Sequence, residues 1–348
     1  MHSHHISLAF LNPVRYGPQY QMELDTNSEA GMRAVQIREF GGPEVVQVRD
    51  LPEPVPAAAE LLVEVARCGV NFADSLLREN GYIASATLPI IPGGEVVGRT
   101  PDGRRVAAMI QNGGYAEKAV VPEAHAFPVP DELDDVEAVA LLAQGLTAWW
   151  LVNRTARIQP GESVVVHAAA GGVGSLALQL ARLRGAERVI AVASTPEKRD
   201  VALSLGADNT IDPAADDLTA ELCAANDGAQ VDVVLEMTGG RVTDQSLAAL
   251  APFGRLALYG MASRIEPEKV SLRALQRRSA TISGFWLMHA FTRPEILEKA
   301  YAELAALVTA GDLRVIHGGD YPMSEVRRAH EDLRNRQSIG KLVIDPAR

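Results

Sequence analysis

The sequence has 348 residues, 47% of them hydrophobic and 22% charged, which is ordinary for a globular protein and long enough for two domains. The net charge of −11 disfavours nucleic acid and anionic membranes as partners, and no uninterrupted apolar run is long enough to span a bilayer. Two cysteines, Cys68 and Cys223, are too few for a four-thiolate zinc site or a disulfide framework, which favours reduced thiols in a cytoplasmic protein.

Residues 1–31 show neither strand nor helix periodicity and carry no signal-peptide pattern, so we expect a disordered extension there. From Met32 to Pro130 the chain is rich in Gly, Pro and Val, with short alternating runs between turn signals, which predicts a compact, mostly-β domain. The expected elements are strands at Met32–Arg38, Glu60–Val65, Arg104–Ile110 and Tyr115–Val121, and one short helix at Phe72–Arg78.

A helix is predicted over Asp134–Val152, and apolar strands then alternate with helices. Such alternation implies a parallel sheet covered on both faces, which is the doubly wound α/β layout of nucleotide-binding domains. The predicted strands are Ser163–His167, Arg188–Ala193, Val231–Met237 and Arg255–Tyr259, and the helices between and after them are Val173–Arg184, Glu197–Leu205, Asp217–Ala225 and Val242–Leu250. Further elements are expected at Thr281–Trp286, Pro294–Thr309, Ser324–Arg334 and Lys341–Ile344.

The most informative segment is the glycine-containing turn after the first of these apolar strands, His167-Ala168-Ala169-Ala170-Gly171-Gly172-Val173-Gly174. A buried strand that runs through small residues into a helix is the context in which a glycine fingerprint indicates dinucleotide binding. Gly171 lets the backbone approach a pyrophosphate, Gly174 lets the helix pack on the strand, and Ala169 replaces the first glycine of the usual pattern. We expect Ala169, Gly171, Gly172, Val173 and Gly174 to contact the cofactor, with its phosphates at the helix N-terminus.

The end of the second strand indicates which nicotinamide cofactor fits. NAD sites place a carboxylate there for the ribose 2′-hydroxyl, whereas this strand ends Ala193-Ser194-Thr195 and is followed by Lys198 and Arg199. A 2′-phosphate needs donors and positive charge, so Ser194, Thr195 and Lys198 favour NADPH. Taken alone, the two cations would be read as the solvated face of a helix.

Several motifs together resemble the medium-chain dehydrogenases/reductases of the zinc-free quinone oxidoreductase (zeta-crystallin-like) branch. They are AAAGGVG at 168–174, CGVNFADSLLRENGY at 68–82, LPIIPGGEVVG at 88–98, QGLTAWW at 144–150 and GKLVI at 340–344. The likeness runs from Met32 to the C-terminus. It implies a GroES-like, mostly-β catalytic domain over 32–152 and 290–348, a Rossmann domain over 153–289, an active cleft between them, and a homodimer or homotetramer.

The resemblance also implies the site residues. The zinc-dependent members carry a Cys where this chain has Asn71 and a His where it has Gly94, and neither replacement can bind zinc as a thiolate or imidazole does. We therefore expect no metal, since Glu95 alone would not hold one. Asn71 and Tyr82 are expected beside the nicotinamide as catalytic groups, and Asn71, Thr147, Gly260 and Lys341 as cofactor contacts, although Thr147 could be an ordinary helix residue and Lys341 a surface lysine.

Two interpretations of Tyr82 stay open, proton donor and pocket lining, and Asp74 is expected to brace the short helix. The pattern departs from the family at Ile83, where Pro is frequent, and at Gly93-Gly94-Glu95. The substrate is therefore the property that the resemblance predicts least well. The leading function is NADPH:quinone reductase, with a quinone, enone or enoyl thioester as the small-molecule partner. The alternatives are a 2-enoyl-thioester reductase and a non-catalytic NADPH-binding protein.

Overall fold

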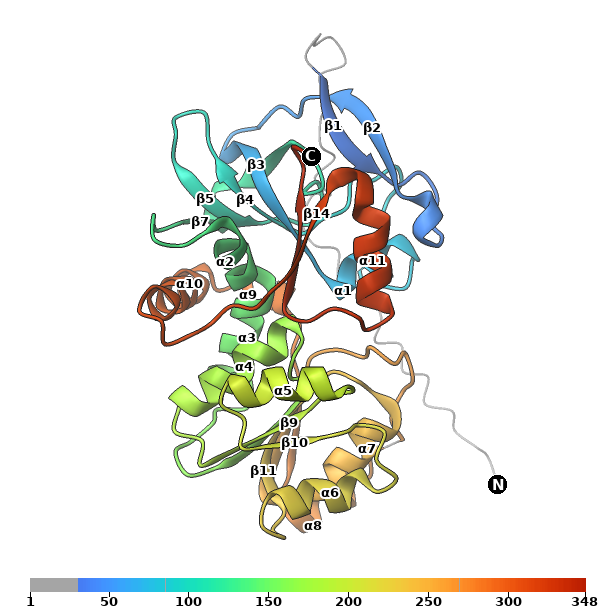
Figure 1. Ribbon diagram of the computed structural model, residues 1–348, viewed down its shortest axis with the longest axis vertical. Coiled ribbons are helices and arrows are strands. Elements are labelled where there is room, and N and C mark those ends of the chain that lie inside the picture. The colour runs from blue at the N-terminus through green and yellow to red at the C-terminus, as the bar shows by residue number, and fades with distance from the viewer. Residues whose placement is uncertain (1–30, 85, 269) are drawn as a thin grey trace, which may run out of the picture.

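The computed structural model describes residues 31–84, 86–268 and 270–348. Two sheets lie one above the other along the long axis of the molecule, with helices between and around them (Figure 1). The extension expected at 1–31 lies outside the described residues, except for Gly31, which begins the first strand.

The upper sheet in Figure 1 takes strands from both ends of the chain. Its order is β14-β15-β3-β4-β5-β7, and β6 also pairs with β3. The pairing is antiparallel except between β14 and β15, and strands β1 and β2 form a separate antiparallel ribbon. The bounds are β1 Gly31–Gln36, β2 Gln47–Pro52, β3 Glu60–Val70, β4 Glu95–Arg99, β5 Arg105–Met109, β6 Lys118–Pro122, β7 Ala126–Pro128, β14 His317–Pro322 and β15 Lys341–Asp345, with the helix α1 at Phe72–Arg78.

The lower sheet has six parallel strands in the order β10-β9-β8-β11-β12-β13. The strand order reverses between β8 and β11, which makes the sheet doubly wound, as the alternation of strands and helices predicted. Its strands are β8 Ser163–His167, β9 Arg188–Val192, β10 Asn209–Ile211, β11 Val231–Glu236, β12 Leu250–Leu258 and β13 Thr281–Gly284, and its helices are α4 Gly172–Leu183, α5 Pro196–Ser204, α6 Leu218–Ala225, α7 Gly240–Ala249 and α8 Leu272–Arg278.

One continuous helical run, Asp135–Thr155, connects the two sheets. In it the α-helical segments α2 (Asp135–Ala140) and α3 (Thr147–Trp150) alternate with π-helical turns. The run is long and apolar enough to cross a membrane by length and composition alone, yet 72% of its most apolar window is buried inside the protein. A core helix passes the same test, so the run is weak evidence for a membrane span.

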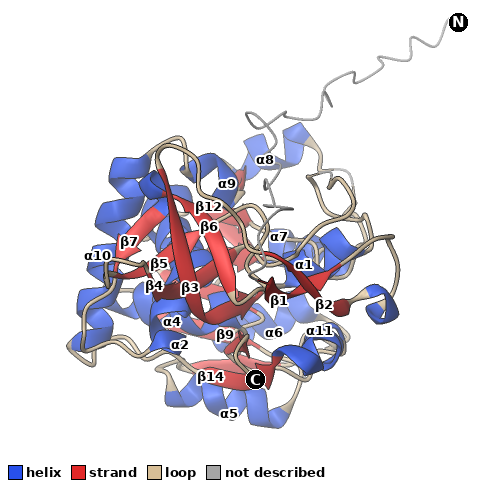
Figure 2. Ribbon diagram, turned by 90° about the horizontal axis from the view of Figure 1, so that it is seen from above, coloured by secondary structure: helices blue, strands red, loops and turns tan. Residues whose placement is uncertain are grey.

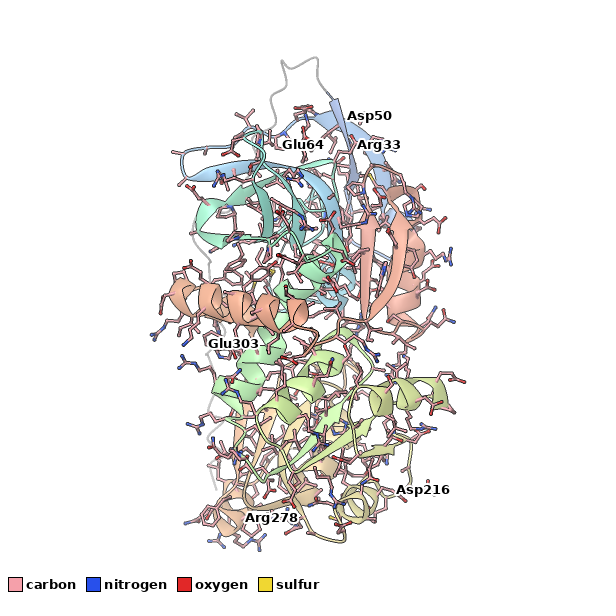
Figure 3. All side chains as sticks on the ribbon, turned by 60° about the vertical axis from the view of Figure 1, so that its left-hand side comes forward. Arg33, Asp50, Glu64, Asp216, Arg278 and Glu303 are labelled. Carbon is pink, nitrogen blue, oxygen red and sulfur yellow. The ribbon has the colours of Figure 1, made fainter. Side chains whose placement is uncertain are left out.

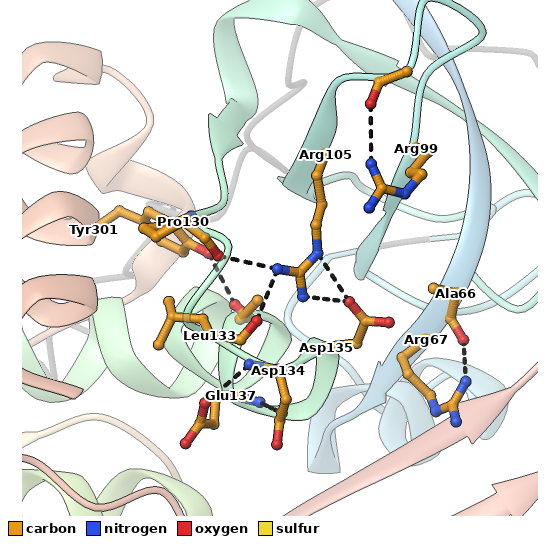
Figure 4. Close-up of polar contacts among 12 residues, drawn as sticks. Ala66, Arg67, Arg99, Arg105, Pro130, Leu133, Asp134, Asp135, Glu137 and Tyr301 are labelled. Atoms are coloured by element: carbon orange, nitrogen blue, oxygen red, sulfur yellow. Dashed lines mark hydrogen bonds and ion pairs between the residues drawn. The ribbon is translucent and has the colours of Figure 1, made fainter. Parts of the chain in front are cut away.

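The start of this run is fixed by polar contacts to the upper sheet (Figure 4). The carboxylate of Asp134 accepts a hydrogen bond from the Glu137 amide (2.7 Å), and Glu137 reciprocates to the Asp134 amide (3.0 Å), forming a capping box. Arg105 on β5 donates to the carbonyls of Pro130 and Leu133 and to the carboxylate that begins α2. These bonds set the direction in which the helical run leaves the β domain.

Helices α9 (Leu287–Ala290), α10 (Pro294–Thr309) and α11 (Val326–Arg334) complete the fold, and helices lie around the strands when the molecule is viewed from above (Figure 2). Helix α10 packs along the run: Glu303, labelled in Figure 3, accepts a bond from the Trp149 indole (3.0 Å), and Tyr301 donates to the Ala138 carbonyl (3.2 Å). The largest apolar core contains residues of both sheets and of these helices, so the two halves of the molecule share one interior.

Candidate active site

The glycine turn lies at the carboxyl end of β8, beside the point where the strand order reverses. Gly171 is the N-cap of α4, and a Cβ on Gly174 would lie 2.3 Å from the Ala168 carbonyl oxygen, which confirms that this glycine is needed for close packing of helix on strand. The left-handed backbone position falls on Ala168 (φ 50°), one residue before Ala169, which was expected to stand for the first glycine. The first amides of α4 have no carbonyl partner within the helix and are available to phosphate oxygens.

Two other segments contact this turn. A Cβ on Gly172 would lie 2.0 Å from the Gln144 side chain of the helical run, one turn before the buried Thr147. On the other side, the Gly340 amide donates to the Ala170 carbonyl (2.8 Å), so the start of the last strand lies directly against the turn. The turn therefore lies against the helical run that carries Thr147 and against the residue before Lys341, two of the expected cofactor contacts.

Two cations lie near the end of β9: Lys198, which the sequence pattern predicted, and Arg336, which it did not. Thr195 caps α5 and its hydroxyl accepts a bond from the Lys198 amide (3.3 Å), while Ser194 is exposed. The Lys198 ammonium donates to the Arg336 carbonyl (2.5 Å), and burial, together with the charge of Arg336, lowers the pKa of Lys198. Arg199, by contrast, is used structurally, because it donates to the Ala193 carbonyl. Arg336 could have been noticed in the sequence only as a cation shortly before the GKLVI motif.

Asn71, Glu95 and Lys341 converge at the junction of the two sheets. Glu95 and Lys341 form an ion pair whose side chains are 0% and 1% exposed. The Asn71 amide nitrogen donates to Glu95 Oε1 (2.7 Å), and Lys341 Nζ donates to Asn71 Oδ1 (3.3 Å). The second Glu95 oxygen accepts a bond from the Ala143 amide of the helical run (2.7 Å). The expectation that Lys341 could be a surface lysine is wrong, because the strand it begins is buried in the sheet.

A chain of hydrogen bonds leads from Asn71 through the interior of the β domain. The Asn71 backbone amide and the Tyr115 hydroxyl both donate to Asp74 Oδ2 (2.8 and 2.9 Å), so Asp74 braces α1 as expected. Tyr115 lies 3.3 Å from His330 Nε2, and Arg78 lies 3.3 Å from His330 Nδ1. Because arginine only donates, His330 Nδ1 must accept, which puts the ring hydrogen on Nε2, directed at Tyr115. Burial raises the pKa of Asp74 to about 6.

The same region is bonded to the loop after β12. Glu79, at the end of α1, accepts a bond from Arg264 (2.7 Å) and pairs with Arg334 on α11. Gly260, an expected cofactor contact, begins this loop, and a Cβ there would lie 3.1 Å from the Met237 Cβ. The loop thus combines a close backbone approach with an ion pair to the other half of the molecule.

Tyr82 is bonded to Trp286, a residue that sequence reasoning did not connect with it. The Trp286 indole donates to the Tyr82 hydroxyl (3.0 Å), and the two rings meet edge to face. Phe285, next to Trp286, stacks on Trp150 of the helical run at 5.8 Å between ring centroids. The hydrogen bond from the indole therefore holds the phenol oxygen of Tyr82 in one position.

Two buried polar residues at the carboxyl end of the parallel sheet were also missed. His167 ends β8 and Glu236 ends β11, the strands on either side of the reversal in strand order. Glu236 accepts bonds from the Thr243 hydroxyl (2.6 Å) and the Thr238 amide (2.5 Å). His167 Nε2 lies 2.8 Å from the Ser246 hydroxyl, and burial lowers the pKa of its ring. The apolar run that predicted β8 gave no signal for this polar end.

Comparison with known proteins identifies the family. Residues 172–306 match the family described as zinc-binding dehydrogenase. The chain is 32% identical over 327 residues to the quinone oxidoreductase of Lama guanicoe, which covers 90% of this chain and 97% of that protein. The chain belongs to the medium-chain dehydrogenase/reductase superfamily. The resemblance inferred from the motifs is therefore confirmed.

Members of this superfamily that are similar to the chain carry more than one name. The synaptic vesicle membrane protein VAT-1 homolog of Mus musculus is 30% identical over 342 residues, covering 90% of this chain and 84% of that one. The quinone oxidoreductase of Thermus thermophilus, solved alone and in complex with NADPH, is 37% identical with a TM-score of 0.82, over 90% of this chain and 100% of that chain. The chain is thus quinone-oxidoreductase-like, and identity near 30% does not fix its substrate.

The zinc in the name of the matching family is not reflected in the residues of this chain. The resemblance implies that Asn71 and Gly94 stand where zinc-dependent members have ligands, and within residues 31–84, 86–268 and 270–348 no three His, Cys, Asp or Glu side chains gather as a metal site would require. Glu95 is already bonded to Lys341, Asn71 and the Ala143 amide. Its carboxylate is therefore satisfied without a cation from solution.

Proposed function

We propose that this protein is a zinc-independent, NADPH-dependent oxidoreductase that reduces conjugated carbonyl compounds, with quinones as its main acceptors. The observation that carries the proposal is the Glu95–Lys341 ion pair beside Asn71. The Glu95 carboxylate beside Asn71 is neutralised by a lysine. Acceptor activation must then come from hydrogen-bond donors, and such donors suit acceptors that delocalise the charge they receive.

The residues fit NADPH. The first amides of α4 and the close approach at Gly174 suit a pyrophosphate, and the neighbouring cations Lys198 and Arg336 suit a 2′-phosphate. When bound, NADPH supplies a hydride. In this proposal Ser194, Thr195 and Lys198 hold the adenosine phosphate, Thr147 and Gly260 border the nicotinamide ribose, and Asn71 faces the reacting end.

The choice of acceptor follows from where the negative charge goes. A quinone spreads it over an aromatising ring and two oxygens, and an enone or enoyl thioester spreads it over an enolate. A simple ketone concentrates it on one oxygen, which this site, without a Lewis acid, stabilises poorly. We therefore expect simple ketones to be turned over slowly or not at all.

A second candidate, 2-enoyl-thioester reductase, is favoured by Tyr82. Such a substrate must gain a proton at its α-carbon, and Tyr82 is a phenol whose oxygen accepts a hydrogen bond from the Trp286 indole (3.0 Å), which holds it in place. In that case Tyr82 is a catalytic acid, whereas for quinones it only shapes the pocket.

The test is NADPH oxidation measured with quinones, enones, enoyl-CoA esters and simple ketones, before and after exhaustive chelation. We expect chelator-insensitive turnover of the conjugated acceptors. Fast, chelator-sensitive ketone reduction with one zinc per chain would contradict the proposal. NADPH binding without oxidation by any acceptor would instead support a non-catalytic NADPH-binding protein.

We also propose a cytoplasmic homodimer. Strand β13 is the last in its sheet, and Leu272 on the neighbouring helix α8 is 82% exposed, so this edge offers both backbone and apolar groups to a second copy. Sedimentation equilibrium should give twice the chain mass for the wild type and a lower mass for Leu272→Glu, whereas a monomeric wild type would refute the dimer.

Cell fractionation should recover the protein in the soluble fraction, and recovery with membranes would refute the proposed cytoplasmic location.

A further inference from the structure

The Asn71 carboxamide has only one orientation that satisfies its neighbours. Its oxygen faces the Lys341 ammonium (3.3 Å) and its nitrogen faces Glu95 Oε1 (2.7 Å). Lysine has no acceptor and a carboxylate has no donor, so a flipped amide would oppose donor to donor and acceptor to acceptor. The ion pair therefore fixes which atom of Asn71 points where.

The absence of a side chain on Gly69 leaves the space that this ion pair occupies. A Cβ on Gly69 of β3 would lie 2.0 Å from Glu95 Oε1 and 2.6 Å from Lys341 Nζ. Gly69 is not among the glycines with positive φ, so its backbone can be adopted by other residues. Space, and not backbone conformation, is therefore what requires glycine here.

Burying two charges is costly unless both are paired and hydrogen-bonded, and a hydrophobic pair of similar size would serve the fold at least as well. This pair meets that condition, because Glu95 accepts hydrogen bonds from the Lys341 ammonium, the Asn71 carboxamide and the Ala143 amide. Charges in a low-dielectric interior polarise the hydrogen bonds next to them. An ammonium on the amide oxygen draws electrons from the amide nitrogen and strengthens its hydrogens as donors.

We propose that Lys341 and Glu95 are positioning residues that orient the Asn71 carboxamide, with Lys341 also polarising it, so that its second nitrogen-bound hydrogen bonds to the carbonyl oxygen of the acceptor. This rests on the proposed function. As the hydride forms a C–H bond to the conjugated carbon, an electron pair moves onto that oxygen, and Asn71 stabilises it. The acceptor is reduced, the nicotinamide is oxidised, and the anion then takes a proton from water.

The experiment is a cycle of three variants: Glu95→Gln/Lys341→Met, which removes both charges but keeps the size of the side chains, Asn71→Ala, and the triple variant. The double variant should lower kcat for a 1,4-benzoquinone about 10- to 100-fold, the effect of losing one charge-assisted hydrogen bond. Asn71→Ala should lower kcat at least as much. The triple variant should resemble Asn71→Ala, because the pair acts only through that amide. Losses that multiply, or an unchanged kcat in the double variant, would overturn the proposal.

Binding of 4-nitrophenolate to the protein loaded with NADP⁺ gives a readout that needs no turnover. Its oxygen mimics the reduced acceptor, and its absorbance reports hydrogen bonding. The double variant and Asn71→Ala should weaken its binding about equally, and Lys341→Arg, which keeps the charge, should retain most of it. Equal binding by all variants would overturn the proposal even if the quinone activity itself proved absent, so the two failures are distinguishable.

A matched control removes a different ion pair. Arg255 bonds Glu162 and the Ala156 carbonyl away from Asn71. Arg255→Met should lower the melting temperature without weakening 4-nitrophenolate binding. If the Glu95→Gln/Lys341→Met variant does not fold, Lys341→Arg and Asn71→Ala still decide the matter: loss of 4-nitrophenolate binding in Lys341→Arg equal to that in Asn71→Ala refutes the positioning role.

Discussion

The most specific prediction concerns cofactor selectivity, because two cations from different elements of the fold, Lys198 and Arg336, lie close together. Lys198 lies on α5 and Arg336 lies after α11, and the Lys198 ammonium bonds to the Arg336 carbonyl (2.5 Å). Burial and the charge of Arg336 lower the pKa of Lys198, while the neighbouring Glu197 carboxylate is hydrogen-bonded to Thr195. A bound 2′-phosphate would relieve this repulsion while gaining two charge-assisted hydrogen bonds.

Each such bond contributes about 1.5–3 kcal/mol, so Lys198→Ala or Arg336→Ala should weaken NADPH binding between about tenfold and somewhat more than a hundredfold. NADH lacks the phosphate and should bind nearly as before. The assay is the Kd of both cofactors by nicotinamide fluorescence at one fixed ionic strength, since salt screens exposed charges. Arg199→Ala is the matched control, because that neighbouring cation is bonded to the Ala193 carbonyl and to Asp212. An NADPH/NADH ratio that is unchanged in both variants, or a wild type that binds NADH as tightly as NADPH, would refute the reasoning.

Three further outcomes follow from the geometry. Tyr82→Phe should lower kcat roughly 10²–10⁴-fold on enoyl thioesters if Tyr82 is a general acid, and much less on quinones, whereas equal, slight losses would make it a pocket-lining residue. Burial and the charge of Arg78 lower the pKa of His330 from 6.5 to about 3. As the pH falls, His330 therefore takes up a proton in the unfolded chain before it does so in the folded protein. The free energy of unfolding consequently decreases from pH 6.5 toward pH 3, by about 2 kcal/mol at pH 5. His330→Gln should remove that slope from urea-unfolding curves and exposed His317→Gln should not; identical slopes would contradict the assignment. Gly174→Ala should force α4 away from the Ala168 carbonyl and cost about 1–3 kcal/mol, with weaker NADPH binding, and unchanged melting and binding would show that the turn can relax.

The parallel sheet was the easiest part of the fold to predict. Buried strands such as Ser163–His167 are continuous apolar runs, and the structure has β8 at the same residues. The short strands β7, β10 and β14 were not predicted, because three to six residues at a sheet edge carry no clear alternation. Helix α8 was missed for a related reason, since it has no buried residue and hence no apolar stripe.

In the candidate site, too, local features could be predicted from the sequence and contacts between distant residues could not. The glycine turn is local, so its residues could be named from the sequence. The contact between Lys341 and Asn71 joins residues 270 apart, and no periodicity reports such a pairing. Lys341 was therefore weighed as a surface lysine, and Glu95 was considered only as a leftover zinc ligand. Arg336 and Trp286 were missed because their partners come from other elements of the fold, whereas Glu236 was missed although its partners, Thr238 and Thr243, are close to it in the sequence.

The order of strands in the antiparallel sheet has a consequence for how the chain is made. Strand β15 (Lys341–Asp345) pairs directly with β3 (Glu60–Val70), and Lys341 completes the contacts of Glu95 and Asn71. The strands of the parallel sheet, in contrast, are consecutive from 163 to 284. On a translating ribosome the parallel sheet can assemble before β15 has been synthesised, whereas the antiparallel sheet stays open beside β3 until β15 has left the exit tunnel. Nascent chains that stop short of residue 341 therefore carry a nearly finished nucleotide-binding half and a reaction centre that has not yet formed.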